Sequence, residues 1–259
     1  MKLFGLIGFP LGHSFSKRYF TEKFERAQIS NCRYELFPLE SIEAFPSLLA
    51  EQPGLAGLNV TIPYKQAVIP YLHHLSAAAT AIGAVNCIHI DPKGQLTGHN
   101  TDAVGFRQSL ENKANGRWAT PQTQALVLGN GGAAKAVFFV LQTLGISYSV
   151  VSRKPNPEAE NEYSWEQVPG LISGLQKQNP DAPVLIVNTT PVGMAPHVED
   201  CPPLPFELFN DQILVFDLVY NPEETVLLRR AGLQGANTLN GLEMLYLQAD
   251  AAWEIWNNT

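Results

Sequence analysis

A glycine-rich turn between an apolar segment and a helical pattern is the feature that most constrains the fold of this chain. The turn reads Gly129-Asn130-Gly131-Gly132-Ala133-Ala134 and matches the pattern G-x-G-x-x-[GA]. It follows the apolar segment Gln124–Leu128, opens a predicted helix over Gly132–Leu144, and precedes a second apolar segment, Ser147–Ser152. In such a β-α-β unit the first glycine permits a tight turn, and the second lets backbone N–H groups approach a pyrophosphate. The turn predicts a dinucleotide site; the alternative is a plain glycine turn.

The rest of the chain continues the alternation of strands and helices. Val184–Asn188 and Ile213–Leu218 repeat the apolar strand pattern, which predicts a doubly wound parallel sheet. In the first hundred residues, strands are predicted over Lys2–Gly8, Arg33–Pro38 and Leu55–Val60, and a helix over Lys17–Ala27. A hairpin is predicted from Val85–Ile90 to Leu96–Thr97, with its turn at Asp91–Gly94. A helix is predicted over Ala103–Asn112, a domain boundary in the polar segment Asn112–Gln124, and a long amphipathic helix over Leu242–Trp256.

The composition of the 259 residues argues against several classes of protein. Hydrophobic residues make up 45% and charged residues 16%, which is typical of a globular protein with a core. A formal net charge of −7 without a basic cluster argues against nucleic-acid binding, and apolar runs such as Ala136–Leu141 are far too short to span a membrane. The three scattered cysteines form neither a disulfide framework nor a metal-binding pattern, so no metal is expected. We therefore expect a soluble, cytoplasmic protein that acts on a small molecule.

The residues after the second strand of the β-α-β unit indicate which dinucleotide binds. A site for NAD usually has an Asp or Glu there, which binds the ribose 2′-hydroxyl group. This chain has Ser152-Arg153-Lys154 and no carboxylate before Glu158. Arg153 can lie against the adenine face and pair with a 2′-phosphate, and Lys154 adds positive charge, so NADP is the expected cofactor. The alternative is a solvated basic turn.

Polar residues lie beside the predicted strands of the first hundred residues. The hydroxyls of Ser14-Phe15-Ser16 precede a predicted helix, where they either cap it or meet a ligand. The segment Asn59–Lys65 follows a strand, and Asn86 and Asp102 lie beside others. One lysine and one aspartate among neutral hydrogen-bonding residues suit a polyol carboxylate, because lysine can exchange a proton with an alcohol or ketone oxygen while aspartate orients it. The alternative for Lys65 is an ordinary surface lysine.

These segments together resemble the shikimate dehydrogenase family, and the resemblance runs through nearly the whole chain. The family motifs fall in order on Ser14–Ser16 (S-x-S), Asn59–Lys65 (N-V-T-x-P-x-K), Gly83–Asn86 (G-A-x-N), Asn100–Gly105 (N-T-D-x-x-G), Gly129–Ala134 (the nucleotide turn), Asn188–Met194 (N-[TA]-[TS]-x-x-G-M), Asp217–Leu228 (D-x-x-Y-x-P-x-x-T-x-[LF]-L) and Gly241–Gln248 (G-x-x-M-L-x-x-Q). Two positions depart from the family pattern. Ala77 stands where an acidic residue is frequent, and Ser152-Arg153-Lys154 stands where Asn-Arg-Thr is commoner.

The resemblance implies a role for each motif. Lys65 would be the acid/base, and Asp102 would be its partner on the substrate. The substrate-binding residues would be Ser14, Ser16, Asn59, Thr61, Asn86, Tyr220 and Gln248. The cofactor-binding residues would be Gly129, Asn130, Gly131, Gly132, Ala133, Ser152, Arg153, Lys154, Thr189, Leu218 and Gly241, the last two near the nicotinamide.

The resemblance also implies an architecture and a reaction. The fold would be α/β, with an N-terminal substrate domain over residues 1–102, a Rossmann-type dinucleotide domain over residues 103–237, and residues 238–259 returning to the first domain. The expected enzyme is a monomer or homodimer that reduces 3-dehydroshikimate reversibly to shikimate with NADP, in aromatic amino-acid biosynthesis. One alternative is a quinate/shikimate dehydrogenase, which would carry an acidic residue in place of Arg153. The other is a non-catalytic binding protein, which would lack Lys65 or Asp102.

Overall fold

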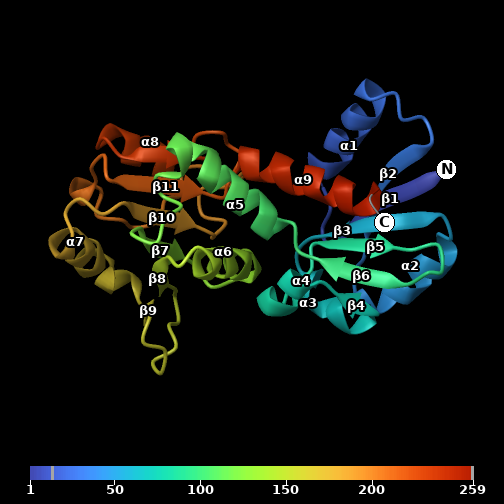
Figure 1. Ribbon diagram of the computed structural model, residues 1–259, viewed down its shortest axis with the longest axis horizontal. Coiled ribbons are helices and arrows are strands. Elements are labelled where there is room, and N and C mark those ends of the chain that lie inside the picture. Colours follow the sequence, from blue (N-terminus) through green and yellow to red (C-terminus); the bar gives the residue numbers. More distant parts are fainter. Residues whose placement is uncertain (13–14, 258–259) are drawn as a thin grey trace. The chain divides into compact units, whose positions relative to one another are not determined.

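The computed structural model describes residues 1–12 and 15–257, which form two compact units (Figure 1). The first unit takes in Met1–Thr101 and the end of the chain from Gln248 onward, and the second takes in Asp102–Leu247. Within the described residues, each unit contains one six-stranded sheet. The predicted α/β fold class, with a Rossmann-type sheet in the second part of the chain, is confirmed.

The sheet of the first unit is mixed. Its strands lie in the order β2 (Cys32–Pro38), β1 (Lys2–Gly8), β3 (Leu55–Val60), β5 (Cys87–Ile90), β6 (Leu96–His99) and β4 (His74–Leu75). β1 pairs in parallel with β2 and β3, whereas β5 pairs antiparallel with β3 and β6. The helices of this unit are α1 (Phe15–Arg26), α2 (Phe45–Glu51), α3 (Tyr64–Ala67), α4 (Ala77–Ile82) and the C-terminal part of α9 (Leu242–Asn257).

The turn between β5 and β6 forms the predicted hairpin. One oxygen of the Asp91 carboxylate accepts hydrogen bonds from the backbone N–H groups of Lys93 (2.8 Å) and Gln95 (2.7 Å). Gly94 has a φ of +78°, a conformation that disfavours a side chain. Because this turn sets the register of the two strands, the segments just before β5 and just after β6 lie side by side.

The end of α9 packs on the sheet of the first unit, as the family resemblance implies. The ring of Trp256 stacks on Phe4 of β1 with centroids 4.8 Å apart, and its Nε1 donates to the carbonyl oxygen of Ile88 at 3.0 Å. Gly57 of β3 makes room for the indole, since a Cβ there would lie 2.3 Å from that nitrogen. The helix end is therefore part of the core of this unit.

A polar contact also joins α1 to α9 within the first unit. Asp250 accepts hydrogen bonds from the hydroxyl group of Tyr19 and the ammonium group of Lys23. Burial by itself would raise the pKa of Asp250, but the two hydrogen bonds and the nearby positive charges outweigh it and hold the pKa below its usual value. The fold thus favours the ionised carboxylate.

We expect this contact to stabilise the fold at neutral pH and to weaken in acid. Because folding lowers the pKa of Asp250, its contribution is complete above the pKa of an unfolded aspartate, about 3.9, and is lost as the pH falls through the lower folded value. The contribution is at most about 1 kcal/mol, because 47% of the Asp250 side chain is exposed and water screens the pair.

Urea unfolding of the wild type and of Asp250→Asn measures this contribution. The two midpoints should differ at about pH 7, and their difference should shrink as the pH falls below about 4 and through the lower folded pKa of Asp250. The control is Glu22→Gln, whose pair with Arg18 is much more exposed and should contribute nothing measurable. A gap between wild type and Asp250→Asn that stayed constant with pH would contradict the assignment.

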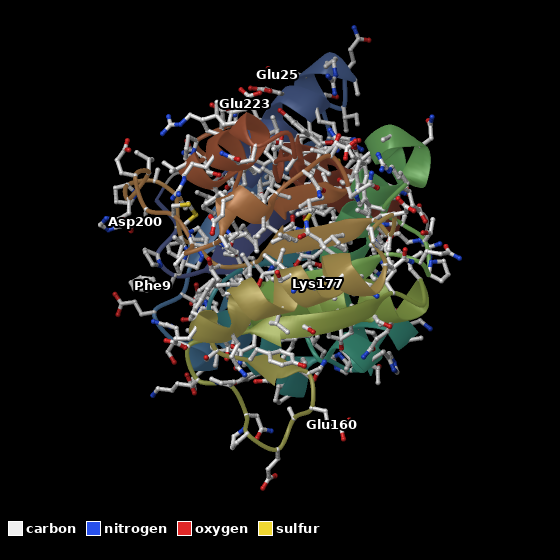
Figure 2. All side chains as sticks on the ribbon, turned by 90° about the vertical axis from the view of Figure 1, so that its left-hand side faces the viewer. Phe9, Glu25, Glu160, Lys177, Asp200 and Glu223 are labelled. Carbon is white, nitrogen blue, oxygen red and sulfur yellow. The ribbon has the colours of Figure 1, made fainter. Side chains whose placement is uncertain are left out.

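The sheet of the second unit is entirely parallel over the described residues. Its strands lie in the order β12 (Asn237–Leu239), β11 (Ile213–Asp217), β10 (Val184–Asn188), β7 (Gln124–Leu128), β8 (Ser147–Val151) and β9 (Glu162–Tyr163). The helices are α5 (Asp102–Asn112), α6 (Gly132–Thr143), α7 (Val168–Gln178), α8 (Val226–Leu233) and the first part of α9. The strand order reverses at β7, which is the predicted doubly wound topology. Figure 2 views this unit from the side of α7.

Two boundaries of the second unit differ from those expected. The polar segment Asn112–Gln124 lies inside this unit, because the preceding helix α5 packs on the parallel sheet, where Phe106 stacks on Phe216 with centroids 5.1 Å apart. Residues 238–247 also belong to this unit, since β12 pairs with β11. Polarity indicates a segment at the surface, and a surface segment need not separate two cores.

Smaller elements complete the description of both units. Short 3-10 turns lie at Ile42–Ala44, Ile69–Tyr71, Lys113–Gly116, Trp165–Gln167 and Phe206–Leu208. None of the helices in the described ranges combines the length and the apolar character needed to cross a membrane. Those ranges also contain no group of three His, Cys, Asp or Glu side chains that could hold a metal ion.

Candidate active site

The glycine turn lies between β7 and α6, where the sequence predicts it. Gly129 has a φ of +104°, and a Cβ there would lie 2.7 Å from the hydroxyl oxygen of Thr189, so glycine is required. The Thr189 hydroxyl donates to the carbonyl oxygen of Leu128 at 2.8 Å. Thr189 therefore holds the segment after β10 against the turn, a structural role distinct from the cofactor contact expected of it.

Gly131 and Gly132 differ from Gly129 in what surrounds them. A Cβ at either residue would meet no atom of the described chain within 4 Å, so internal packing does not require glycine there. Gly131 is the N-cap of α6, no side chain of the described residues caps it, and the first helical turn contains no acidic residue. Asn130 precedes this cap, and Ala133 lies in the first turn. The uncapped N–H groups and the positive end of the helix dipole fit a pyrophosphate.

The end of β8 carries the residues expected to select the cofactor. Ser152 is 5% exposed, and its hydroxyl has no hydrogen-bond partner among the described residues. A buried hydroxyl without a partner costs free energy unless a ligand or water satisfies it. Arg153 and Lys154 follow and are exposed, while the Glu162 carboxylate accepts a hydrogen bond from the backbone N–H of Asn156. A phosphorylated ribose fits an unsatisfied hydroxyl beside two cations.

The two residues expected near the nicotinamide lie against each other. The N–H of Gly241 donates to the carbonyl oxygen of Val219 at 3.1 Å, and a Cβ on Gly241 would lie 2.1 Å from the carbonyl oxygen of Leu218. Only glycine lets the chain after β12 approach the end of β11 this closely. Tyr220 lies in the same segment and is exposed.

Asp217 is a buried carboxylate to which the sequence analysis assigns no role. It accepts hydrogen bonds from the Asn188 side-chain amide (2.9 Å), the Val219 N–H (3.1 Å) and the Thr225 hydroxyl (2.6 Å). Burial raises the pKa of Asp217 above its usual value, although these three donors act in the opposite direction. Asp217 thus ties the ends of β10 and β11 to the start of α8 and holds the loop between them.

On the side of the first unit, three of the predicted substrate residues form a hydrogen-bonded network with Thr101, which was not among those predicted. The N–H of Thr101 donates to Oδ1 of Asn86 at 2.6 Å, and Nδ2 of Asn86 lies 3.0 Å from the Thr101 hydroxyl. Nδ2 of Asn59 donates to the Asn86 carbonyl oxygen at 3.3 Å, and the Thr101 hydroxyl lies 3.5 Å from Oε1 of Gln248. This hydrogen-bonded network joins β3, the segments that flank the β5–β6 hairpin, and α9.

Lys65 lies on the short helix α3, close after β3. Its carbonyl oxygen accepts a hydrogen bond from the N–H of Val85 at 2.7 Å, and the hydroxyl of the neighbouring Tyr64 donates to the carbonyl oxygen of Leu39. These two bonds anchor α3, and Lys65 is half-buried. Asp102 is the first residue of α5 and belongs to the second unit.

Two further predicted residues of the first unit are half-buried. Ser16 lies in the first turn of α1, and Thr61 follows β3. The N–H of Thr61 donates to the carbonyl oxygen of Ile7 at 2.9 Å, and Gly8 leaves room for the threonine methyl group. Ser14 lies outside the described residues.

Tyr34 is a buried residue of this side that the sequence analysis did not single out. Its hydroxyl donates to Oδ1 of Asn59 at 2.8 Å. A tyrosine in a strand is usually read as part of the core, since its ring suits a half-buried pleated surface. Only the pairing of β2, β1 and β3 shows that its hydroxyl reaches the predicted site.

The parallel sheet, the glycine turn and the basic strand end of the second unit define a dinucleotide-binding protein of the Rossmann type. The family profile described as the shikimate dehydrogenase substrate binding domain matches residues 6–88. The chain is 40% identical to the shikimate dehydrogenase (NADP(+)) of Nostoc sp. in an alignment that covers 98% of this chain and 90% of that protein. The chain belongs to the shikimate dehydrogenase family.

Solved structures agree with this family over the whole chain. A chorismate mutase/shikimate 5-dehydrogenase fusion protein from Clostridium acetobutylicum is 34% identical with a TM-score of 0.86, and the match covers 100% of this chain and 92% of that one. The shikimate 5-dehydrogenase of Thermus thermophilus, in complex with NADP(H) and shikimate, is 34% identical with a TM-score of 0.79. That match covers 100% of this chain and 94% of the other.

Proposed function

We propose that this protein catalyses the NADP-dependent, reversible reduction of 3-dehydroshikimate to shikimate, a step in aromatic amino-acid biosynthesis. The observation that carries the proposal is the match over nearly the full chain to proteins named shikimate dehydrogenase (NADP(+)), at 36% and 40% identity in two of them. The glycine turn and basic strand end of the second unit support the cofactor. The buried amide and hydroxyl groups of the first unit support a small polar substrate.

The proposed chemistry divides between the cofactor and two side chains. When bound, NADP supplies the acceptor for the hydride that leaves the carbon bearing the reacting hydroxyl group. Lys65 takes the proton of that hydroxyl as the ketone forms, and returns it to the ketone oxygen in the reverse direction. Asp102 orients the lysine or the neighbouring hydroxyl group through its negative charge.

The remaining residues hold the two ligands. Neutral amides and hydroxyls, fixed by their own hydrogen bonds, suit the carboxylate and hydroxyl groups of shikimate. The residues proposed for this task are Ser14, Ser16, Asn59, Thr61, Asn86, Tyr220 and Gln248. The start of α6 would hold the pyrophosphate, Arg153 and Lys154 the 2′-phosphate, and Leu218 and Gly241 the nicotinamide.

The test of the proposed function compares shikimate and quinate, each with NADP and with NAD. Spectrophotometric formation of the reduced cofactor should give the highest kcat/KM for shikimate with NADP. A higher kcat/KM for quinate with NAD would identify a quinate dehydrogenase instead. Binding of shikimate without turnover in any combination would identify a non-catalytic binding protein.

Arg153→Ala is expected to raise the KM for NADP by about tenfold or more, the size of one lost charge-assisted contact, and to leave the KM for NAD nearly unchanged. The reason is that only NADP carries the 2′-phosphate that Arg153 would pair with. Steady-state kinetics with each cofactor at saturating shikimate measures the difference.

The control for Arg153→Ala is Lys177→Ala, which removes an exposed positive charge from α7 of the same unit (Figure 2). This variant should leave both KM values unchanged, because no predicted cofactor residue lies on α7. An equal rise in the KM for NADP and the KM for NAD in Arg153→Ala would show that Arg153 does not bind the 2′-phosphate.

The proposal includes a cytoplasmic location and a monomer or homodimer. Three cysteines, Cys32, Cys87 and Cys201, are free thiols, which supports a reducing compartment. Burial raises the pKa of Cys32 and of Cys201, so the protonated thiol is favoured at neutral pH. Sedimentation or light scattering distinguishes the two oligomeric states.

A further inference from the structure

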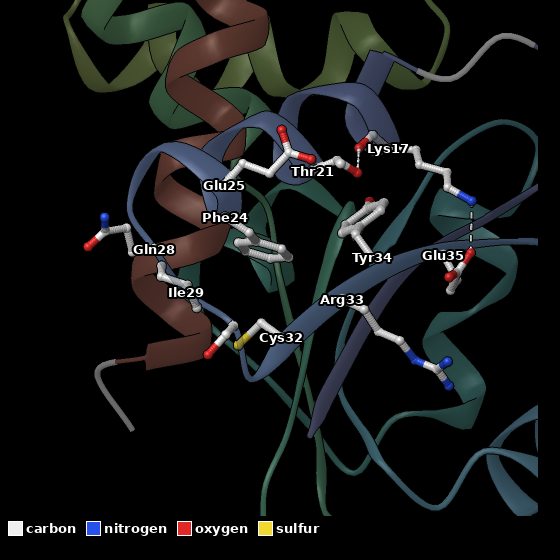
Figure 3. Close-up of a pocket in the computed structure, with 11 residues that line it drawn as sticks. Lys17, Thr21, Phe24, Glu25, Gln28, Ile29, Cys32, Arg33, Tyr34 and Glu35 are labelled. Atoms are coloured by element: carbon white, nitrogen blue, oxygen red, sulfur yellow. Dashed lines mark hydrogen bonds and ion pairs between the residues drawn. The ribbon is translucent and has the colours of Figure 1, made fainter.

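The hydroxyl group of Tyr34 is a polar group inside the apolar core of the first unit. Tyr34 lies on β2 and is 3% exposed, and its ring stacks on Phe20 of α1 with centroids 4.6 Å apart. Figure 3 shows the ring lying between β2 and α1, beside the ion pair of Lys17 and Glu35. Because a buried phenol without hydrogen bonds costs free energy, the partner of this hydroxyl explains why a tyrosine stands here.

The hydroxyl is hydrogen-bonded to a residue proposed to hold the substrate. It donates its proton to Oδ1 of Asn59 at 2.8 Å. Burial raises the pKa of Tyr34 well above its usual value, so the hydroxyl keeps its proton at any ordinary pH.

This bond fixes the orientation of the Asn59 side chain on β3. With its oxygen held by Tyr34, the Asn59 amide directs its nitrogen toward the Asn86 carbonyl oxygen, where the bond measures 3.3 Å. The hydroxyl of a β2 residue thereby sets the direction of an amide on β3.

We propose that Tyr34 is a positioning residue of the shikimate site, which holds Asn59 in the orientation that binds substrate. This inference rests on the proposed function. Tyr34 does not itself touch the substrate in this role, so its loss should weaken substrate binding more than it slows the chemical step. If Tyr34 served only to fill the core, its replacement would change the free energy of unfolding and leave substrate binding unchanged.

Tyr34→Phe tests the proposal, because it keeps the ring stacking and removes only the hydroxyl. The Kd and KM for shikimate should rise by about fivefold, the size of one lost hydrogen bond, while kcat with NADP and the KM for NADP change less than about twofold. Calorimetry gives the Kd, and steady-state kinetics gives the other constants. Tyr71→Phe, a tyrosine of the same unit outside the site, is the matched control and should leave all of them unchanged.

A double-variant cycle with Asn59→Ala separates positioning from general destabilisation. If Tyr34 acts through Asn59, the double variant should raise the shikimate KM by less than the product of the two single effects. Multiplicative effects, or a lowered Tm with an unchanged shikimate Kd, would overturn the proposal. If Tyr34→Phe does not fold, Tyr34→Met removes the same hydroxyl with a side chain that fills irregular core space, and the same result is expected.

The wild-type protein distinguishes this inference from the proposed function. Failure of the wild type to oxidise shikimate with NADP would contradict the proposed function and, with it, the role of Tyr34. Normal wild-type activity together with an unchanged shikimate Kd and KM in folded Tyr34→Phe would overturn only the role of Tyr34.

Discussion

Replacing Lys65 with alanine is expected to lower kcat for shikimate oxidation by about 10²-fold or more, the scale of losing a general acid/base, while the Kd for shikimate changes far less. The reason is that the Lys65 amine is proposed to take the proton of the reacting hydroxyl group in this direction, whereas many neutral groups share the binding of the substrate. Initial rates of NADPH formation at saturating shikimate give kcat, and calorimetry gives the Kd.

The control for Lys65→Ala is Lys93→Ala in the exposed β5–β6 turn, which removes a lysine from the same unit. It should retain wild-type kcat and Kd. Circular dichroism must show that Lys65→Ala is folded, which we expect because the bond from the Val85 N–H uses the backbone of Lys65 and not its side chain. Near-normal turnover in folded Lys65→Ala would rule out the proposed mechanism.

Asp102→Asn is also expected to reduce kcat by about 10²-fold or more, because it keeps the shape of the side chain and removes the charge that orients the lysine or the substrate hydroxyl. Asp102 lies in the first turn of α5, where a negative charge also stabilises the helix. That effect is at most about 2 kcal/mol for a half-buried charge, and it acts on the stability of the fold rather than on turnover.

Thermal unfolding separates the two effects of Asp102→Asn. We expect a small fall in Tm beside the large fall in kcat. The control is Asp181→Asn, an exposed aspartate of the same unit, which should change neither quantity. A kcat for Asp102→Asn within about twofold of the wild type would remove Asp102 from the proposed mechanism.

The bounds of the long buried strands are evident in the sequence. The predicted bounds of β3, β7 and β10 are those of the structure, because each strand is buried and therefore reads as a continuous apolar segment. The glycine turn is also recognisable from the sequence, because it follows one such strand, opens a helix and precedes a second strand. The cofactor expected from Arg153 agrees with relatives named as NADP-dependent.

Three short strands leave no recognisable pattern in the sequence, for a physical reason. β4, β9 and β12 contain only two or three residues each, too few for any alternation of polar and apolar side chains to appear. They exist because a longer neighbouring strand offers them hydrogen bonds. The same pairing placed residues 238–247 with the second unit, against expectation.

The sequence by itself determined the local elements, the nucleotide turn and the chemistry of the candidate side chains, because each depends on residues close together in the chain. The tertiary structure decided which polar groups support them. Tyr34 reaches Asn59 across 25 positions, and Asn188 reaches Asp217 across 29. Each contact depends on which strands are neighbours and in what register, and that choice is set by the packing of the whole sheet rather than by any local pattern.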